Sequence, residues 1–363
     1  MDVLIVETLD GDVLQWLEAR HAVHFAPELA QDQAAFATAL ALTRAVVIPP
    51  STALDAAMLK KAPRLRLVAR LAVGTENIDL EACARCGVEV VRPASASAAA
   101  EAEFVVSALL AMLRRVPIVN PEGLLVGREL GSCTVGLVGM TPAVQPLAKL
   151  LTAFGARVLG YDPSVHISDA LWSRHGIEAV GLRELMARSD GVAVLLAFFS
   201  RYRGLFGDRL FQGAKNNQVL VSLAHSNLFD EQALAQALTH GPLAAAWMDS
   251  LEPGVLDPER PLHRVATLQV TPRVSSITQG SRLRGAWAVA QRIDEMLMSS
   301  PLPTGAVAAA VAPAVASTFA STVAVAETAP AAVVAAPVLP ATQPVRQSRP
   351  TLNAGPAAAP GSA

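Results

Sequence analysis

The 363-residue chain has few of the residues that mark a disulfide scaffold, a nucleic-acid-binding protein or a metal site. Its three cysteines are too few for a disulfide framework, and they favour a reducing compartment, the cytoplasm. The formal net charge of −2 gives no electrostatic reason to expect nucleic acid as a partner. The seven histidines are scattered, and none of them forms an H-E-x-x-H motif. We therefore predict no metal ligand set.

Two of the cysteines, Cys83 and Cys86, form a single C-x-x-C. No second C-x-x-C or C-x-x-H completes a zinc site. A redox pair and two packed small residues both stay open as interpretations. The motif ends a helical pattern instead of opening one after a strand, which favours packing. The first residues, "MDVLIVETLDG", have no basic region before an apolar core, so we expect a first strand there and not a secretory signal.

The composition changes near Ser300. From there the chain consists mainly of Ala, Val, Pro, Thr and Ser with very few charges, and such a segment cannot bury enough surface to offset its ordering entropy. We predict a disordered tail over 299–363 that tethers another protein. Residues 305–326 are uncharged and long enough to span a bilayer, but they are Ala-dominated, contain Pro313 and lack Leu and Ile. We expect no membrane contact.

The first 298 residues alternate apolar runs with helical patterns. The apolar runs predict strands at 2–6, 45–50, 65–73, 88–93, 134–140, 156–163, 191–198, 218–224, 243–249 and 266–272. Helical patterns occupy 103–116, 143–155, 182–190, 230–241 and 280–297. This alternation predicts an α/β fold with two doubly wound parallel-sheet domains.

Residues 134–163 have the layout of a dinucleotide-binding strand, turn, helix and strand. Gly139 supplies the first glycine of the expected G-x-G-x-x-G turn, whereas Thr141 and Val144 occupy the other two glycine positions. Pro142 removes a backbone N–H that could face a phosphate. We expect a recognisable fold signal with a compromised phosphate cradle.

The second strand of this unit ends at Asp162. A carboxylate there can accept hydrogen bonds from both ribose hydroxyls and would repel a 2′-phosphate, which favours NAD over NADP. The alternative is an aspartate that caps the turn before Pro163.

Together with this strand, turn and helix layout, the sequence of residues 1–298 resembles the D-isomer-specific 2-hydroxyacid dehydrogenase family, whose members include phosphoglycerate dehydrogenase and hydroxypyruvate reductase. The stretches that match in register are "LRLVARLAVGTENIDLEACARCGVEVV", "AEFVVSALLAMLRRVP", "RGLFGDRLFQGAKNNQVLVSLAHSNLFDEQALAQAL" and "AAAWMDSLEPGVLDPERPLHRVATLQVTPRVSS". The resemblance implies a flavodoxin-like outer domain over 1–100 plus 279–298 and a Rossmann NAD-binding domain over 101–278. It also implies a homodimer and a small 2-keto or 2-hydroxy acid as substrate.

The resemblance further assigns two sets of binding residues. The cofactor set adds Ala143 and Asp249 to the turn residues and Asp162 named above. The substrate set is Val73, Gly74 and Thr75.

Three positions of the family's catalytic set are substituted in this chain. Family members use an Arg to hold the substrate carboxylate and a His, oriented by a Glu, to donate the proton. The Arg position is His225, the Glu position is Gly254 with Glu252 two residues earlier, and the His position is Arg273. In addition, "LLAFF" at 195–199 replaces a family stretch that lines the cofactor, so we expect Phe198 and Phe199 to narrow that pocket.

Two hypotheses follow from these substitutions. One is that the family reaction is weak or absent and the chain serves as a binding or scaffolding module. The other is an active NAD-dependent 2-keto acid reductase in which Arg and His have traded places. There, Arg273 would hold the carboxylate and His225 would donate the proton with Glu252 as its orienting group.

Overall fold

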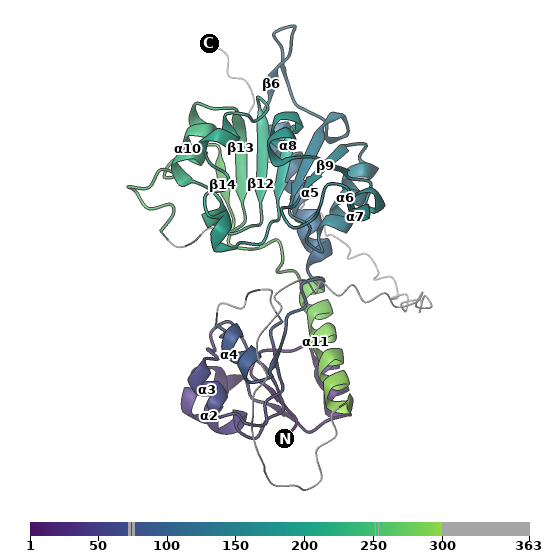
Figure 1. Cartoon of the computed structure of the whole chain (residues 1–363), viewed down its shortest axis with the longest axis vertical. Coiled ribbons are helices and arrows are strands. Elements are labelled where there is room, and N and C mark those ends of the chain that lie inside the picture. The colour runs from purple at the N-terminus through teal and green to yellow at the C-terminus, as the bar shows by residue number, and fades with distance from the viewer. Residues whose placement is uncertain (72–73, 75–76, 251, 253, 300–363) are drawn as a thin grey trace, which may run out of the picture. The chain divides into compact units, whose positions relative to one another are not determined.

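The structure is a computed structural model that describes residues 1–299 except 72–73, 75–76, 251 and 253. The described residues form two parallel sheets and an antiparallel hairpin (Figure 1). The predicted α/β fold with parallel sheets is therefore confirmed. Contacts divide the chain into Met1–Pro303 and Thr304–Ala363, so the predicted domain boundaries inside the first unit stay a prediction. The predicted tail, from residue 300 on, lies outside the described residues.

The first sheet has five parallel strands in the order β2-β1-β3-β4-β5. Its strands are β1 (Val3–Ile5), β2 (Val23–Phe25), β3 (Ala45–Val47), β4 (Leu67–Ala69) and β5 (Glu89–Val91). The helices of this part of the chain are α1 (Gly11–Glu18), η1 (Pro27–Gln31), α2 (Gln33–Leu40), α3 (Ala56–Lys60), α4 (Leu80–Arg85) and α11 (Gln279–Ser299). Buried side chains of α2, α3 and α4 pack on one face of the sheet, and those of α1 and α11 pack on the other.

The second sheet has seven parallel strands in the order β10-β9-β8-β11-β12-β13-β14. Its strands are β8 (Thr134–Val138), β9 (Arg157–Tyr161), β10 (Glu178–Ala179), β11 (Gly191–Val194), β12 (Gln218–Ser222), β13 (Leu243–Met248) and β14 (Leu268–Val270). The helices are α5 (Ala98–Arg115), η2 (Leu130–Ser132), α6 (Val144–Ala153), α7 (Ala170–Arg174), α8 (Leu182–Arg188), η3 (Ser200–Tyr202), α9 (Asp208–Phe211), η4 (Ser226–Leu228) and α10 (Glu231–Thr239). Strands β6 (Ile118–Val119) and β7 (Leu125–Val126) form the hairpin.

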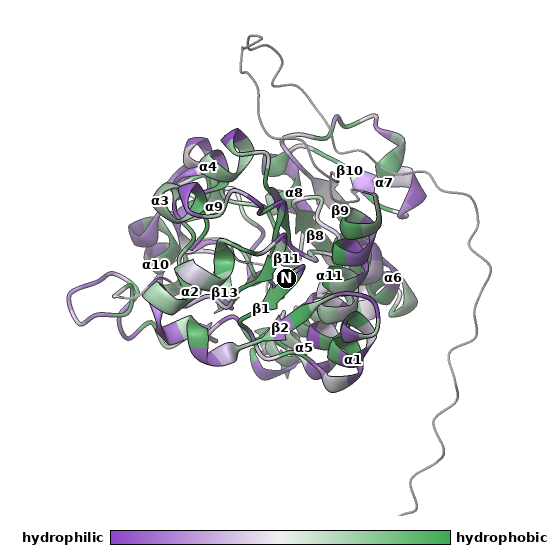
Figure 2. Ribbon diagram, turned by 90° about the horizontal axis from the view of Figure 1, so that it is seen from below, coloured by the Kyte–Doolittle hydropathy of each residue, from purple (hydrophilic) through white to green (hydrophobic). Residues whose placement is uncertain are grey.

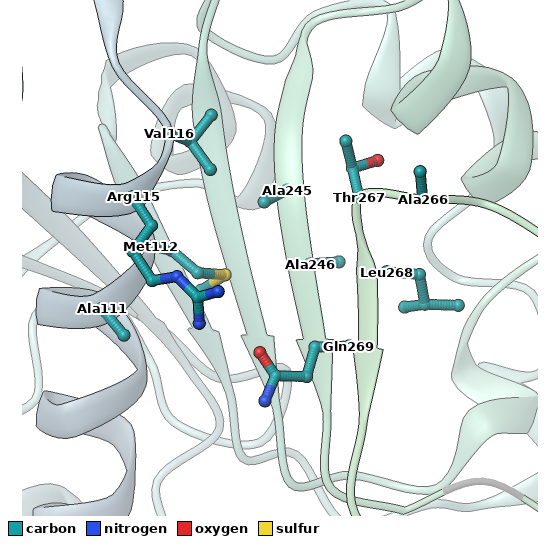
Figure 3. A pocket seen from close by; sticks show the side chains of 10 residues that line it. All are labelled: Ala111, Met112, Arg115, Val116, Ala245, Ala246, Ala266, Thr267, Leu268 and Gln269. Carbon is teal, nitrogen blue, oxygen red and sulfur yellow. The ribbon is translucent and has the colours of Figure 1, made fainter. Parts of the chain in front are cut away.

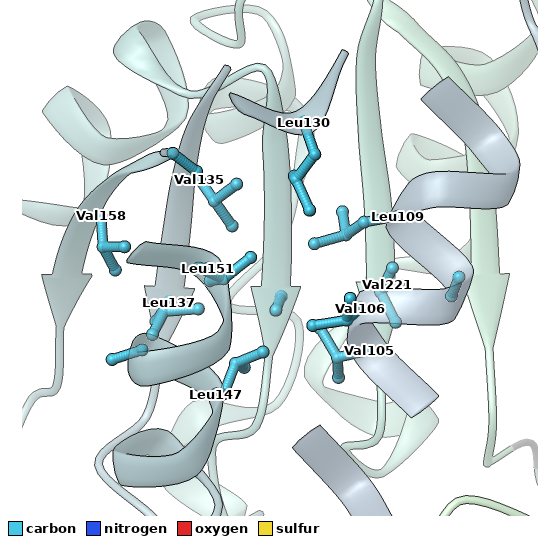
Figure 4. Close-up of a cluster of buried hydrophobic side chains, with 14 of the residues drawn as sticks. Val105, Val106, Leu109, Leu130, Val135, Leu137, Leu147, Leu151, Val158 and Val221 are labelled. Atoms are coloured by element: carbon cyan, nitrogen blue, oxygen red, sulfur yellow. The ribbon is translucent and has the colours of Figure 1, made fainter. Parts of the chain in front are cut away.

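Both faces of the seven-stranded sheet are covered, which explains why its central strands β8, β11, β12 and β13 are mostly apolar and buried. One face packs on α5 and α6 through Leu109, Leu147 and Leu151 (Figure 4). The other face packs on α8, α9 and α10. Figure 2 shows the difference in hydropathy between buried strands and surface helices. Strands β1 and β11 are hydrophobic, whereas α1 and α6 have both hydrophobic and hydrophilic residues.

Aspartate side chains set the starts of helices on both sheets. Each accepts a hydrogen bond from a backbone N–H in the first turn, which satisfies a donor that the helix itself leaves unpaired. The capping residues of α1, α2, α3, α4, α7 and α10 are Asp10, Asp32, Asp55, Asp79, Asp169 and Asp230. These caps fix the residues at which the helices begin, and therefore the loops that connect them to the preceding strands.

The C-x-x-C pair spans the end of α4 with unequal exposure. Cys83 is buried and Cys86 is exposed. Burial raises the pKa of the Cys83 thiol to about 11, with the charge of Asp79 adding to it. At pH 8 only about one Cys83 in a thousand is then the reactive thiolate. We expect iodoacetamide at pH 8 to label Cys86 and leave Cys83 unlabelled in the folded protein, as read by peptide mass spectrometry. Rapid labelling of both would contradict this packed arrangement.

Two further findings concern the described residues only. No helix among them is long and apolar enough to cross a membrane, and 305–326 lies outside this search. The described part also holds no group of three or more His, Cys, Asp or Glu side chains arranged to hold a metal ion.

Candidate functional site

The topology of the seven-stranded sheet predicts a ligand-binding crevice at the carboxyl ends of β8 and β11. The chain runs outward from β8 to β9 and β10 and then returns to the other side of β8 at β11. Ligands of open parallel sheets bind outside the carboxyl ends of the strands at such a reversal. The turn that follows β8 and the segment 195–199 that follows β11 therefore flank the expected binding crevice.

The turn after β8 needs a glycine at residue 139. Gly139 has φ +105°, and a Cβ there would lie 2.5 Å from the backbone nitrogen of Leu196. Its own N–H donates to the carbonyl of Tyr161 at 2.8 Å. The turn thus contacts the end of β9 and the segment that follows β11, and only glycine fits it.

The other predicted turn residues differ in their exposure to solvent. Ala143 and Val144 are buried and help to begin α6, whereas Pro142 is exposed. The Thr141 hydroxyl is buried and has no hydrogen-bond partner among the described residues. Because α6 has no side-chain cap at its N-terminus, this hydroxyl and the helix end fit one phosphate group. The turn therefore offers a phosphate one hydroxyl and one helix N-terminus.

Asp162 links the glycine turn to the turn that follows β9. One carboxylate oxygen accepts from the N–H of Met140 at 2.7 Å, and the other accepts from the N–H of Ser164 at 2.7 Å and its hydroxyl at 2.5 Å. A carboxylate offers about four acceptor sites, so these three bonds leave about one for a ribose hydroxyl. The turn-capping contacts are present, and a bidentate ribose contact would need one of them to break.

His225 lies directly after β12 with both of its ring nitrogens engaged. Nδ1 accepts from the N–H of Asn227 at 3.1 Å, and Nε2 lies 2.9 Å from Oε1 of Glu252. Since Nδ1 accepts, the proton sits on Nε2 and points to the carboxylate. The imidazole also stacks on Phe198 with ring centres 4.7 Å apart. Arg203 lies 5.6 Å from the centre of the Phe198 ring.

Arg273 occupies a strained backbone position next to the same carboxylate. It has φ +55°, its N–H donates to the carbonyl of Asp249 at 2.8 Å, and its Nε donates to the Ser250 hydroxyl at 3.2 Å. Arg273 and Glu252 line one pocket of about 330 Å³. Among the described residues Oε2 of Glu252 is buried without a hydrogen-bond partner. The structure therefore brings the three predicted catalytic residues together, with Glu252 in the middle.

Asp249, predicted to bind cofactor, is buried and anchors the turn that carries Arg273. One of its oxygens accepts from the Thr271 hydroxyl at 2.5 Å and the Val274 N–H at 3.0 Å, and the other accepts from the Ser275 N–H at 2.8 Å. These bonds occupy most of its acceptor capacity.

Glu101 is a candidate that the sequence analysis did not single out. It lies in the first turn of α5, where the Ser97 hydroxyl donates to its Oε1 at 2.7 Å. Burial raises the pKa of its carboxyl, and the negative charge of Asp249 raises it further against the effect of the Ser97 bond. Acidic residues are common in the first turn of a helix, so the sequence alone does not single out Glu101. Its proximity to Asp249, which is distant in the sequence, is what distinguishes it.

The predicted substrate residues are only partly visible. Gly74 is described and half-buried, whereas Val73 and Thr75 lie outside the described residues.

Comparisons with known proteins agree with this geometry. The family model described as "D-isomer specific 2-hydroxyacid dehydrogenase, NAD binding domain" matches residues 110–275. The chain is 30% identical over 306 residues to (S)-sulfolactate dehydrogenase of Chromohalobacter salexigens, which covers 82% of this chain and 98% of that protein. It is 32% identical over 269 residues to D-3-phosphoglycerate dehydrogenase of Mycobacterium tuberculosis, which covers 71% of this chain. The match spans 50% of that longer relative.

Solved structures give the same result. The TT0316 protein from Thermus thermophilus superimposes with a TM-score of 0.66 at 27% identity, covering 84% of this chain and 99% of that one. The D-lactate dehydrogenase from Aquifex aeolicus, at 19% identity and a TM-score of 0.64, shares the fold over 82% of this chain and 96% of that one. With the parallel sheets, the glycine turn and these relatives in view, the chain belongs to the D-isomer-specific 2-hydroxyacid dehydrogenase family.

Proposed function

We propose that this chain binds NAD and that it catalyses the family's oxidoreductase reaction weakly or not at all. The observation that carries the proposal is the contact between His225 and Glu252. The position that the family gives to a cation holds an imidazole whose two nitrogens are both used inside the protein. No guanidinium is therefore available at that position to hold a substrate carboxylate.

The reaction requires a cation on the carboxylate and a proton donor on the carbonyl oxygen. NAD, when bound, supplies or accepts the hydride. At the family's proton-donor position Arg273 has a guanidinium, which does not lose a proton in proteins. Loss of either role typically lowers a rate by about 10²–10⁴-fold. These two substitutions therefore support the proposal of weak or absent catalysis in a chain with the family's fold.

The residues that would hold NAD are Gly139, Thr141 and Asp162. Gly139 permits the tight turn after β8, and the unpartnered Thr141 hydroxyl lies just before the N-terminus of α6. The carboxylate of Asp162 repels a 2′-phosphate, so we propose NAD over NADP. A fluorescence or calorimetric titration with NADH and NADPH tests this assignment. Absence of NADH binding at millimolar concentration would exclude every redox function.

Phe198 is expected to limit nucleotide binding because it follows β11 at the crevice and stacks on His225. Such a ring pair contributes about 0.5–1.5 kcal/mol, which an incoming nucleotide must displace. We expect Phe198→Ala to bind NADH about two- to tenfold more tightly than the wild type. Phe199→Ala is the matched control, since Phe199 is 52% exposed and pairs with Tyr202. Weaker binding by Phe198→Ala would show instead that the ring supports the nucleotide.

The second candidate function is 2-keto acid reduction with exchanged roles. It is favoured by the same 2.9 Å contact, because Glu252 is placed to orient His225 while Arg273 lines the adjoining pocket. A screen of small 2-keto acids with NADH at 340 nm tests it. Turnover that is abolished both by His225→Ala and by Arg273→Ala would support this candidate. Turnover that neither substitution changes would contradict it.

We also propose that the chain forms a homodimer through the seven-stranded part. The β6–β7 hairpin exposes Val119, Leu124 and Leu125, which are each more than 60% accessible. A groove of about 230 Å³ lies between α5 and the edge strand β14, lined by Met112, Val116, Leu268 and other residues (Figure 3). Exposed apolar surface of this kind marks an interaction site. Light scattering after size exclusion tests the dimer, and Leu125→Asp should shift it towards monomer.

All three cysteines are free, which supports a reducing compartment, and we propose the cytoplasm.

A further inference from the structure

A cluster of exposed cations lies at the amino edge of the five-stranded sheet. This basic cluster consists of Lys60, Lys61, Arg64 and Arg66. Lys60 ends α3, Lys61 follows as its C-cap, and the two arginines lie between α3 and the start of β4. All four residues are exposed, and within the described part of the chain none of their side chains forms an ion pair or a hydrogen bond. Four like charges within seven residues repel one another, and an anionic partner would relieve that repulsion.

The carboxylates beside the basic cluster already have partners. The backbone N–H of Arg66 donates to the carbonyl of Arg44, and its carbonyl accepts from the N–H of Glu89. Arg44 pairs with Asp2 at 3.4 Å, and Glu89 pairs with Arg292 at 2.8 Å. The dipole of α3 accounts only for the two lysines at its C-terminus, because its effect falls off within one turn. The two arginines have no structural role of this kind.

A groove between α2 and α3 leads to the basic cluster. It measures about 520 Å³, and Lys61 is one of the residues that line it. Both helices follow strands of the same parallel sheet and pack on one face of it, so they run side by side from its carboxyl edge to its amino edge (Figure 1). The eight residues of α2 make the groove about 12 Å long, which is the length of about four residues of an extended peptide.

The two ends of the groove differ in charge. Asp55 lines it at the start of α3, where its Oδ1 accepts from the N–H of Met58 at 2.7 Å. Lys61 lines the opposite end, next to the rest of the basic cluster. A chain that lies in the groove therefore needs its anionic groups at the amino edge and an uncharged part beside Asp55.

The remaining lining suits a peptide backbone. Gln33 lies at the same end as Asp55 and is exposed, and its amide can both donate to and accept from a peptide group. Ala34, Ala37 and Ala57 have short side chains that leave room for a backbone between the helices. Carboxylates of the peptide can then pair with the guanidiniums and ammonium groups of the basic cluster.

Other anionic macromolecules fit this surface less well. None of the described residues that line the groove is aromatic, whereas single-stranded nucleic acid is held largely by stacking on aromatic rings. The lining also has no exposed large apolar side chain that could enter a membrane. The chain's own residues 301–363 contain one acidic residue, Glu327, so the acidic peptide belongs to another protein.

We propose that the groove between α2 and α3, with the basic cluster at its amino-edge end, binds an extended peptide that carries a run of Asp or Glu residues. The acidic run lies on the basic cluster, and the uncharged part follows the groove towards Gln33. None of these residues belongs to the nucleotide turn or to the His225 set. The surface therefore works without nucleotide and without turnover, and the proposal goes beyond the function proposed above.

The test is a titration of the full chain by fluorescence anisotropy, without nucleotide. The probe is a fluorescein-labelled, end-blocked peptide of four alanines and four glutamates. We expect binding at 0.1 M NaCl that weakens about tenfold or more at 1 M, because the screening length falls from about 10 Å to about 3 Å. The same peptide with four lysines in place of the glutamates should not bind.

The first pair of variants tests the charges. Lys61→Glu with Arg64→Glu should weaken the binding of the glutamate peptide about tenfold or more. Lys149→Glu with Arg174→Glu makes the same change of net charge at exposed residues of α6 and α7 and should leave the affinity unchanged. Melting temperatures of both double variants show whether each still folds.

The second pair of variants tests the groove. Ala57 is exposed in the lining, so Ala57→Trp fills the groove without entering the core and should weaken the binding about tenfold. Ala187→Trp is the matched control at an exposed position of α8 and should bind as the wild type does.

Three results would overturn the proposal. One is a wild-type chain that does not bind the glutamate peptide at 0.1 M NaCl. Another is a control variant that loses as much affinity as its test variant. The third is tighter binding of a twelve-residue oligothymidine or of phosphatidylserine vesicles than of the peptide. NADH binding is measured separately and should be the same in all four variants, so failure here leaves the proposed function standing.

Discussion

Exchanging the two residues in one double variant, His225→Arg with Arg273→His, is expected to raise the rate of 2-keto acid reduction by NADH about 100-fold or more. The variant restores a cation after β12 and a proton donor after β14, which are the two roles that the chemistry requires. Glu252 contacts residue 225 and lines the pocket of residue 273, so one carboxylate is within reach of both new side chains. The measurement is the initial rate at 340 nm with a panel of small 2-keto acids.

The backbone permits this exchange. Residue 273 has φ +55°, a region that histidine adopts more readily than most residues. Gly254, at the family's glutamate position, has φ +83°. A Cβ added to it would lie 3.2 Å from a carboxylate oxygen of Asp257. We therefore leave Gly254 unchanged in the test, since a glutamate there would be strained and would face a like charge.

Two outcomes bear directly on the proposed function. His225→Gln with Arg273→Gln is the control for disruption of the pocket and should show no rise in rate. A wild-type chain that already turns over at about 1–10³ s⁻¹, which is ordinary for enzymes, would contradict weak catalysis and leave the exchanged-role mechanism as the explanation.

The second large effect is expected at the glycine turn, where Gly139→Ala should destabilise the protein by roughly 3 kcal/mol or more. The added Cβ would lie 2.5 Å from the nitrogen and 2.6 Å from the Cα of Leu196, which are backbone atoms in a buried strand end. The residue would also have to adopt φ +105° with a side chain, which alone costs about 1 kcal/mol or more. Thermal and urea unfolding measure the change.

Gly155 offers a matched control for that prediction. It also has a left-handed backbone, with φ +92°, but a Cβ there would approach its nearest neighbour only to 3.6 Å. Gly155→Ala is therefore expected to cost about 1 kcal/mol, the conformational part alone. Equal losses for the two variants would mean that the contact between the turn and Leu196 contributes little. If Gly139→Ala keeps the stability of the wild type but loses NADH binding, the substitution affects only nucleotide binding.

The sequence by itself determined the fold class and the positions of the long apolar elements. All ten predicted strands and all five predicted helices are present, with ends displaced by a few residues, because continuous apolar runs and helical periodicity report burial directly. The eight-residue helices α1 and α2 were not predicted. The short elements β2, β6, β7 and β10 were not predicted. They have two or three residues each and lie at sheet edges or in the hairpin, where burial is too small to leave a pattern.

Only the tertiary structure decided how the site residues meet. The substitutions at 225, 254 and 273 were readable in the chain, but the 2.9 Å contact between His225 and Glu252 depends on how the segments after β12 and β13 converge. The use of Asp249 as a turn anchor and the pairing of Glu101 with Ser97 have no counterpart in spacing or composition. Hydrogen bonds and desolvation act over a few ångströms between residues far apart in sequence, and a linear pattern contains no such distances.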